Sequence, residues 1–172
     1  MWLLPIAFMI HDFEEIIMMR PWAAKNSGEI QRRFPALAAR MLPQMERLST
    51  SSFALAVAEE FILLSAITYF AVEYELYSVW AGVLLVFFIH LVGHIIQFVL
   101  YRKYVPVILT GLIASLYCVF ALYFLNLQNY LLWPDVAKWT VISAVVLIMN
   151  LVFVHSLARR FEKWLNAGFA KS

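Results

Sequence analysis

Residues 77–101 read YSVWAGVLLVFFIHLVGHIIQFVLY and contain no Lys, Arg, Asp or Glu. A helix of about 20 mostly apolar residues is long enough to cross the hydrocarbon core of a membrane. Soluble domains carry about 25% charged residues, whereas this chain of 172 residues carries 14% and is 64% hydrophobic. The stretch therefore predicts a membrane-spanning helix, and the composition argues against a soluble enzyme or a soluble binding domain.

Four further apolar stretches bring the number of predicted spans to five. The predicted boundaries are about 2–19, 53–72, 77–101, 105–127 and 136–157. All six tryptophans fall at or just beyond these ends, as expected of side chains that anchor helices at the membrane interface. We therefore predict an all-α fold, in which residues 1–172 form a single membrane domain built as a five-helix bundle in a lipid bilayer.

The basic residues predict the orientation of this bundle. Of the 13 Lys and Arg residues, all but Lys138 lie between residues 20 and 47, at residues 102–103 or after residue 158. Cytosolic segments of membrane proteins are enriched in Lys and Arg, so we expect the N-terminus outside and the C-terminus in the cytosol. The 13 basic residues are nearly balanced by 11 acidic ones, and no basic field indicates a nucleic-acid partner.

Residues 20–50, between the first two predicted spans, form a segment that is long for a simple connection. Apolar and basic residues alternate along it at helical spacing, with Pro35 and Pro43 expected to break or kink it. We expect one or two amphipathic helices on the cytosolic membrane surface; the alternative is a lid over a site that faces the cytosol. One helical face consists of Leu37, Met41, Met45 and Leu48, and the basic residues Arg33, Arg40 and Arg47 repeat every seven residues.

Ionisable side chains inside the predicted spans are the main functional signal. A charged side chain in mid-membrane costs about 2.5–3.5 kcal/mol on the insertion scale. No Lys or Arg lies inside a predicted span to compensate for such charges. We therefore expect the carboxylates to be neutralised by a metal ion or by protons, with a protonated hydrogen-bond network as the structural alternative. The spans contain all four histidines and five of the 11 acids: His11, His90, His94, His155, Asp12, Glu14, Glu15, Glu59 and Glu60.

The spacing of these residues suits metal binding. Residues at positions i, i+3 and i+4 share one face of a helix. His11, Glu14 and Glu15 of the first predicted span have this spacing, and His90 and His94 of the third span are four residues apart. At a rise of 1.5 Å per residue, the ionisable groups on four of the predicted helices lie at similar depths in the cytosolic half of the membrane. We predict the ligands His11, Glu14, Glu15, Glu59, His90 and His94, with Glu60 and His155 as catalytic base or supporting residues and the role of Asp12 left open.

The motif His11-Asp12-Phe13-Glu14-Glu15 in a first hydrophobic segment resembles the HXXEE-motif family. The Glu59-Glu60 pair and the His90/His94 pair are similar to the same family, which consists of small, mostly bacterial, multi-helix membrane proteins without an agreed function. The resemblance implies a bacterial inner-membrane protein and a site at these residues, but no particular reaction.

Two functions fit this pattern. The first is a membrane metalloenzyme with one or two divalent ions, acting on a hydrophobic or lipid-like substrate that enters from the bilayer. Its ligand set resembles that of helical-bundle di-iron proteins, which implies oxidation, whereas zinc implies hydrolysis by a metal-activated water. The alternative is a transporter or channel for divalent metal or protons, since Glu and His inside spans also mark ion pathways. The sequence leaves open whether the chain forms a homo-oligomer.

Overall fold

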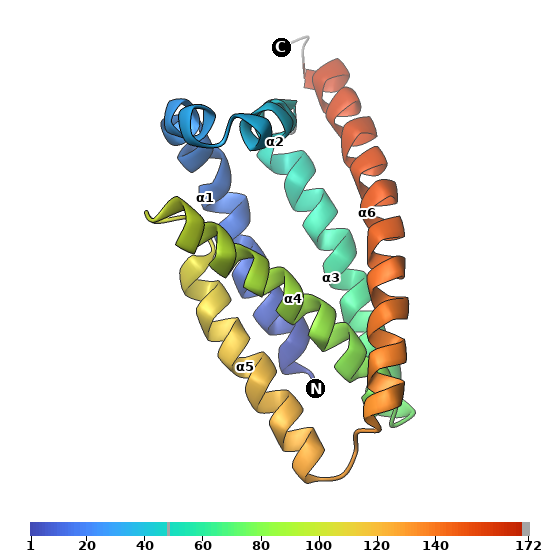
Figure 1. Cartoon of the computed structure of the whole chain (residues 1–172). Helices are drawn as coiled ribbons and strands as arrows, with labels where there is room; N and C mark the ends of the chain where they lie inside the picture. The colour runs from blue at the N-terminus through green and yellow to red at the C-terminus, as the bar shows by residue number, and fades with distance from the viewer. Residues whose placement is uncertain (48, 170–172) are drawn as a thin grey trace.

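The computed structural model describes residues 1–47 and 49–169, and this part of the chain is all-α (Figure 1). The all-α part of the predicted fold is therefore confirmed. Leu48 of the predicted surface segment and Lys171 of the basic tail lie outside the described residues. The six helices are α1 (Leu3–Arg33), α2 (Pro35–Arg47), α3 (Thr50–Glu73), α4 (Tyr77–Tyr101), α5 (Ile108–Leu127) and α6 (Trp133–Phe169).

Four of these helices, α3 to α6, are long and apolar enough to cross a membrane. They coincide with the second to fifth predicted spans. The first helix is not among them, and its N-terminal half carries the three carboxylates of Asp12, Glu14 and Glu15. The structure thus supports four spans by length and composition, and the fifth stays a prediction.

The segment predicted to lie on the membrane surface, residues 20–50, is largely helical, but its helices are divided differently from the prediction. Helix α1 continues beyond the predicted end at residue 19, through Pro21, to Arg33. Pro35 begins α2, a position where the missing N–H of proline costs nothing, and Pro43 lies inside α2 without ending it. Figure 1 shows α2 running across the end of the bundle where α6 also ends. Its placement on a membrane surface stays a prediction.

Helix α4 is central to the packing and lies closely against α6 and α5. A Cβ atom at Gly82 of α4 would lie 2.7 Å from the backbone carbonyl carbon of Trp139 in α6, so only glycine allows this approach. Helix α1 packs against α2, α3 and α5. It faces α4 across a space that side chains of both helices fill, and the candidate site lies there.

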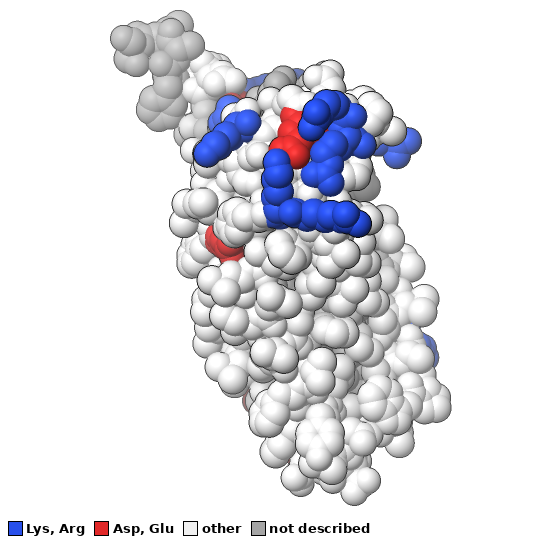
Figure 2. All heavy atoms as spheres, turned by 60° about the vertical axis from the view of Figure 1, so that its left-hand side comes forward, with Lys and Arg blue, Asp and Glu red and all other residues white. Residues whose placement is uncertain are grey.

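The end of α1 is fixed to the end of α4 by charged groups. Arg33 donates hydrogen bonds to the carbonyls of Tyr101 (2.7 Å) and Leu100 (3.2 Å), which have no partner within their own helix because they belong to its last turn. Glu29 accepts from Lys103 at 2.7 Å and pairs with Arg33 at 3.3 Å. Figure 2 shows the Lys and Arg side chains of this face gathered at the same end of the molecule.

Candidate metal centre

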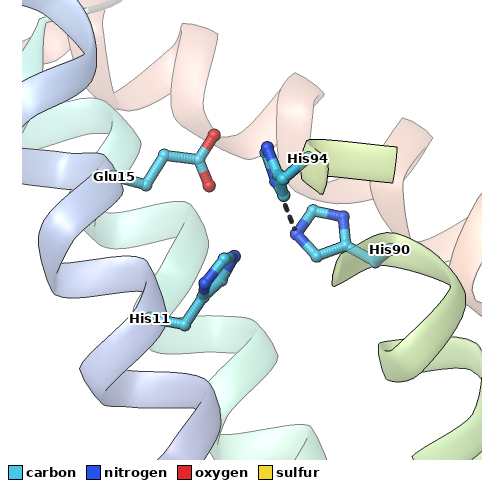
Figure 3. A group of neighbouring side chains, drawn as sticks. All are labelled: His11, Glu15, His90 and His94. Carbon is cyan, nitrogen blue, oxygen red and sulfur yellow. Dashed lines mark hydrogen bonds between the residues drawn. The ribbon is translucent and has the colours of Figure 1, made fainter. Parts of the chain in front are cut away.

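Three histidines and one glutamate from α1 and α4 converge in the space between the two helices (Figure 3). Each of the four residues offers one ligand atom, and these four atoms all lie within 4.8 Å of one another. Ligand atoms around a tetrahedral ion with bonds of about 2.1 Å lie roughly 3.4 Å apart. Small side-chain movements therefore suffice to bring all four atoms onto one ion. The group consists of His11, Glu15, His90 and His94.

The pair His90 and His94 lies one helical turn apart on α4. Their Nε2 atoms are 3.1 Å apart and the rings are nearly perpendicular, with an interplanar angle of 86°. His94 is buried, and its Nδ1 has no hydrogen-bond partner in the part of the chain that the structure describes. His90 is exposed. The pair thus presents two nitrogens at the separation of neighbouring metal ligands, with one side of the site accessible from the surface of the bundle.

His11 faces this pair from α1. Its side chain is fully buried, and its ring centroid lies 5.2 Å from that of His94 and 5.5 Å from that of His90. Its Nδ1 lies 3.3 Å from the hydroxyl of Thr110, whereas its Nε2 is buried and has no hydrogen-bond partner within residues 1–47 and 49–169. A buried nitrogen without a partner is costly, and a metal ion would satisfy it.

Glu14 lies outside this four-residue group and faces α5. Its carboxylate accepts hydrogen bonds from the Tyr104 hydroxyl (2.9 Å), the Thr110 hydroxyl (2.7 Å) and the Thr110 backbone N–H (3.4 Å). Partial burial and then the hydrogen bond to Glu14 raise the pKa of Tyr104, so its hydroxyl stays protonated and donates. A helix N-terminus favours a negative charge, so the carboxylate of Glu14 has compensation other than a metal or a proton.

The remaining predicted site residues occupy different positions. Glu59 accepts a hydrogen bond from Asn150 at 3.0 Å and is not in the four-residue group. Glu60 lies close enough to Glu15 for their charges to interact. His155 is exposed, and its Nδ1 lies 2.6 Å from the carbonyl oxygen of Leu151 in its own helix. The structure therefore brings together four of the six predicted ligands, and the proposed roles of the others stay predictions.

Asp12 lies beside the site and has an unusual environment. Its side chain is 6% exposed, and its Oδ2 has no hydrogen-bond partner among the described residues. Glu15 and Glu60 are close enough to interact with its charge. Asp12, Glu15 and Glu60 thus form a group of three neighbouring carboxyl groups beside the histidines.

Residues 11–15 of α1 carry the spacing of one histidine followed by two adjacent glutamates. The family profile described as "Protein of unknown function with HXXEE motif" matches residues 2–124, well over half of the chain. The chain belongs to the HXXEE family. This confirms the resemblance seen in the sequence, and the described motif of the HXXEE family is the segment that supplies His11 and Glu15. Comparison with curated proteins and with solved structures finds no significant match.

Sequence reasoning missed Thr110 and Tyr104 of this HXXEE protein. A threonine near the start of an apolar span and a tyrosine in a short connection are common, and neither signals a site. Both residues gain their place only because the start of α5 packs against α1. The one indication in the sequence is Pro106, which lies in the connection between α4 and α5, shortly before α5 begins.

Proposed function

We propose that this protein is an integral membrane metalloenzyme that holds one divalent ion between α1 and α4 and acts on a hydrophobic, lipid-like substrate. The observation that carries the proposal is the convergence of His11, Glu15, His90 and His94 within 4.8 Å in a chain with four helices apolar enough to span a membrane. Ionisable side chains are costly inside a bilayer, and where they occur they usually mark a functional site.

One ion fits the group better than two. Sites that hold two bridged ions are rich in carboxylates, whereas Glu15 is the one carboxylate that joins the three histidines. The carboxylates of Glu14 and Glu59 accept hydrogen bonds elsewhere, from the hydroxyl of Thr110 and the side-chain amide of Asn150. A single ion bound by three nitrogens and one oxygen therefore uses the ligand atoms that the structure brings together.

The number of ligands favours iron over zinc. Four protein ligands close a tetrahedral zinc ion and leave no position for a substrate or a water molecule. The same four ligands leave two positions free on a six-coordinate ion, and imidazole suits iron as well as zinc. Iron would supply redox chemistry, and we propose oxygen-dependent oxidation of the substrate. Glu60, near Glu15, is the proposed proton-accepting group beside the ion.

The exposure of the site favours a substrate from the bilayer. His11 and His94 are buried, but His90 is exposed on the surface of α4. This helix is one of the four with the length and composition of a membrane span, so the open side of the site would face lipid. The basic end seen in Figure 2 would lie in the cytosol, because Lys and Arg are enriched on that side of membrane proteins.

Elemental analysis of the detergent-purified protein, prepared without chelators or a nickel column, tests this proposal. We expect about one iron per chain in the wild type, and loss of most of this iron in His94→Ala and Glu15→Gln. The matched controls are His155→Ala and Glu73→Gln, which remove the same side chains outside the cluster and should leave the iron content unchanged.

Each other outcome has a definite meaning. About one zinc per chain, lost in the same two variants, would keep the metal site and overturn the assignment of iron. Equal metal content in the cluster variants and their controls would show that the ligands are wrong. A wild-type protein that binds neither iron nor zinc after both are added would overturn the proposal in favour of a protonated hydrogen-bond network.

A further inference from the structure

We infer that Glu14 is a positioning residue, which acts through Thr110 to fix the proton of His11 on Nδ1 and leave the lone pair of Nε2 free for the ion. The inference deepens the proposed function and rests on His11 being a ligand. It divides the motif between two tasks, because His11 and Glu15 face the ion and Glu14 faces α5.

The direction of the hydrogen bonds around Thr110 carries the argument. A threonine hydroxyl has one proton to donate and two lone pairs that accept. The hydroxyl of Thr110 lies 2.7 Å from Oε2 of Glu14 and 3.3 Å from Nδ1 of His11. An ionised carboxylate can only accept, so the proton of Thr110 points to Glu14. Toward His11 the same oxygen can then only accept, and Nδ1 of His11 must carry the proton.

The position of Glu14 ensures that Thr110 donates its hydroxyl proton to Glu14 and not to His11. Val107, the N-cap residue of α5, has no side chain that caps the helix. The carboxylate of Glu14 lies at this N-terminus, where it accepts from the backbone N–H of Thr110 at 3.4 Å. The Tyr104 hydroxyl donates to its other oxygen at 2.9 Å. With the helix N-terminus and both hydroxyls around it, the carboxylate is stabilised in its ionised, accepting form.

The consequence for the site is a nitrogen prepared to bind a metal. With the proton on Nδ1, Nε2 of His11 carries a free lone pair, and this buried atom has no hydrogen-bond partner among the residues that the structure describes. A histidine ligand commonly donates its other N–H to an oxygen, which fixes both its tautomer and the orientation of its ring. The geometry of α1 separates the two glutamates, since Glu14 lies about 60° from His11 around the helix and Glu15 about 40° on the other side.

The first test measures the tautomer directly in metal-free protein at about pH 8, where free imidazoles are neutral. Long-range proton–nitrogen correlation spectra of protein labelled with ¹⁵N-histidine distinguish the two tautomers, and the signals of His11 are those absent from His11→Ala. We expect the Nδ1–H form in the wild type and in Thr110→Ser, which keeps the hydroxyl. In Thr110→Val we expect a mixture of tautomers.

Removing Glu14 gives a sharper result. In Glu14→Leu the hydroxyl of Thr110 loses its acceptor and is free to donate to Nδ1 of His11, so we expect the Nε2–H form to become populated. The control for Thr110→Val is Thr140→Val in α6, where the hydroxyl bonds to the carbonyl of Val136 in its own helix at 2.8 Å. This control should keep the wild-type His11 signals.

The second test measures affinity for Zn²⁺ and Fe²⁺ in these variants. We expect Thr110→Val to bind about 10–100-fold more weakly than the wild type, and Thr110→Ser to recover most of that loss. A wild-type His11 in the Nε2–H form would overturn the inference, even if metal binds. An Nδ1–H form in a wild-type protein that binds no metal would keep the positioning and overturn the proposed function. If Thr110→Val does not fold, the tautomer of His11 in the wild type and the metal affinity of Thr110→Ser still test the inference.

Discussion

The Nε2 atoms of His90 and His94 lie 3.1 Å apart, one turn from each other on α4. Two neutral imidazoles at this distance share one proton in a hydrogen bond, or they bind one ion together. In either case the two rings cannot both be protonated without strong repulsion between them. The pair therefore makes the site sensitive to acid.

Acidification is expected to release the metal. An imidazole ligates only in its neutral form, so protons and the ion compete for the same nitrogens. We expect metal bound at about pH 7.5 to be lost only at pH values well below the ordinary pKa of histidine of about 6.5, because two of the three rings are buried and the bound ion competes with their protons. Elemental analysis after gel filtration at a series of decreasing pH values checks this, and a metal content that stays constant down to the pH of unfolding would contradict histidine ligands.

Gly82 is expected to be required for the packing of α4 against α6. The Cβ of an alanine there would lie 2.7 Å from backbone carbon and 2.8 Å from backbone nitrogen in α6, which cannot move aside separately from the helix. We expect Gly82→Ala to lower the free energy of unfolding by about 1–3 kcal/mol. Gly93→Ala is the control on the same helix, because nothing lies within 4 Å of its added Cβ. Unfolding in mixed detergent micelles checks both, and equal stability of the two variants would count against the close approach.

Gly111 of α5 is expected to set the room available to His11. An alanine Cβ there would lie 3.6 Å from Cε1 of His11, an ordinary contact. We therefore expect Gly111→Ala to keep the metal content of the wild type. The larger side chain in Gly111→Leu should displace the imidazole and lower the metal content, since ligation depends on ring position. Equal metal content in both variants would show that His11 does not depend on this contact.

The contact between Glu29 and Lys103 is expected to make a pH-dependent contribution to stability. The hydrogen bond from Lys103 is the main cause that lowers the pKa of Glu29 from its ordinary value of 4.5. A carboxylate with a lowered pKa stabilises the folded state above its unfolded value, and this contribution is lost as the pH falls through the folded value. We expect Glu29→Gln to lower the melting temperature at pH 7 slightly, because the contact is exposed and screened by salt.

The difference between wild type and Glu29→Gln should shrink as the pH falls below 4.5, and it should vanish below the lowered pKa of Glu29, where the wild-type carboxyl is protonated too. Glu73→Gln, at the exposed end of α3, controls for the removal of one acid. A difference that persists unchanged at acidic pH would mean that the carboxylate charge of Glu29 does not stabilise the fold.

Much of the fold could be predicted from composition and local pattern. The helices of residues 77–101 and 108–127 agree with the predicted spans within three residues, because apolar length decides them and few residues in them compete for other conformations. The extension of α1 through Pro21 could not be predicted. A proline inside a helix usually kinks or ends it, and here contacts of Glu29 and Arg33 with the end of α4 hold the helix beyond it.

The candidate site could be predicted in part. The cost of ionisable groups in a membrane selected His11, His90 and His94 from the sequence alone, and helical spacing placed each pair on one face. Spacing alone could not show which of Glu14 and Glu15 faces the histidines of α4, because both lie within about 60° of His11 around α1. Their difference comes from a contact 96 residues away, where the hydroxyl of Thr110 and the N-terminus of α5 receive Glu14.

The placement of Glu14 against the start of α5 also bears on how the chain is assembled during synthesis. Helix α1 leaves the ribosome before α4 and α5, yet these later helices carry the groups that compensate its carboxylate and complete its histidine site. A helix with three acids in its N-terminal half and no partners gains little by entering lipid alone. We therefore expect α1 to wait at the membrane surface during translation and to enter the bilayer only when α4 and α5 are in place, so a helix made before α4 and α5 would be among the last to reach its final position.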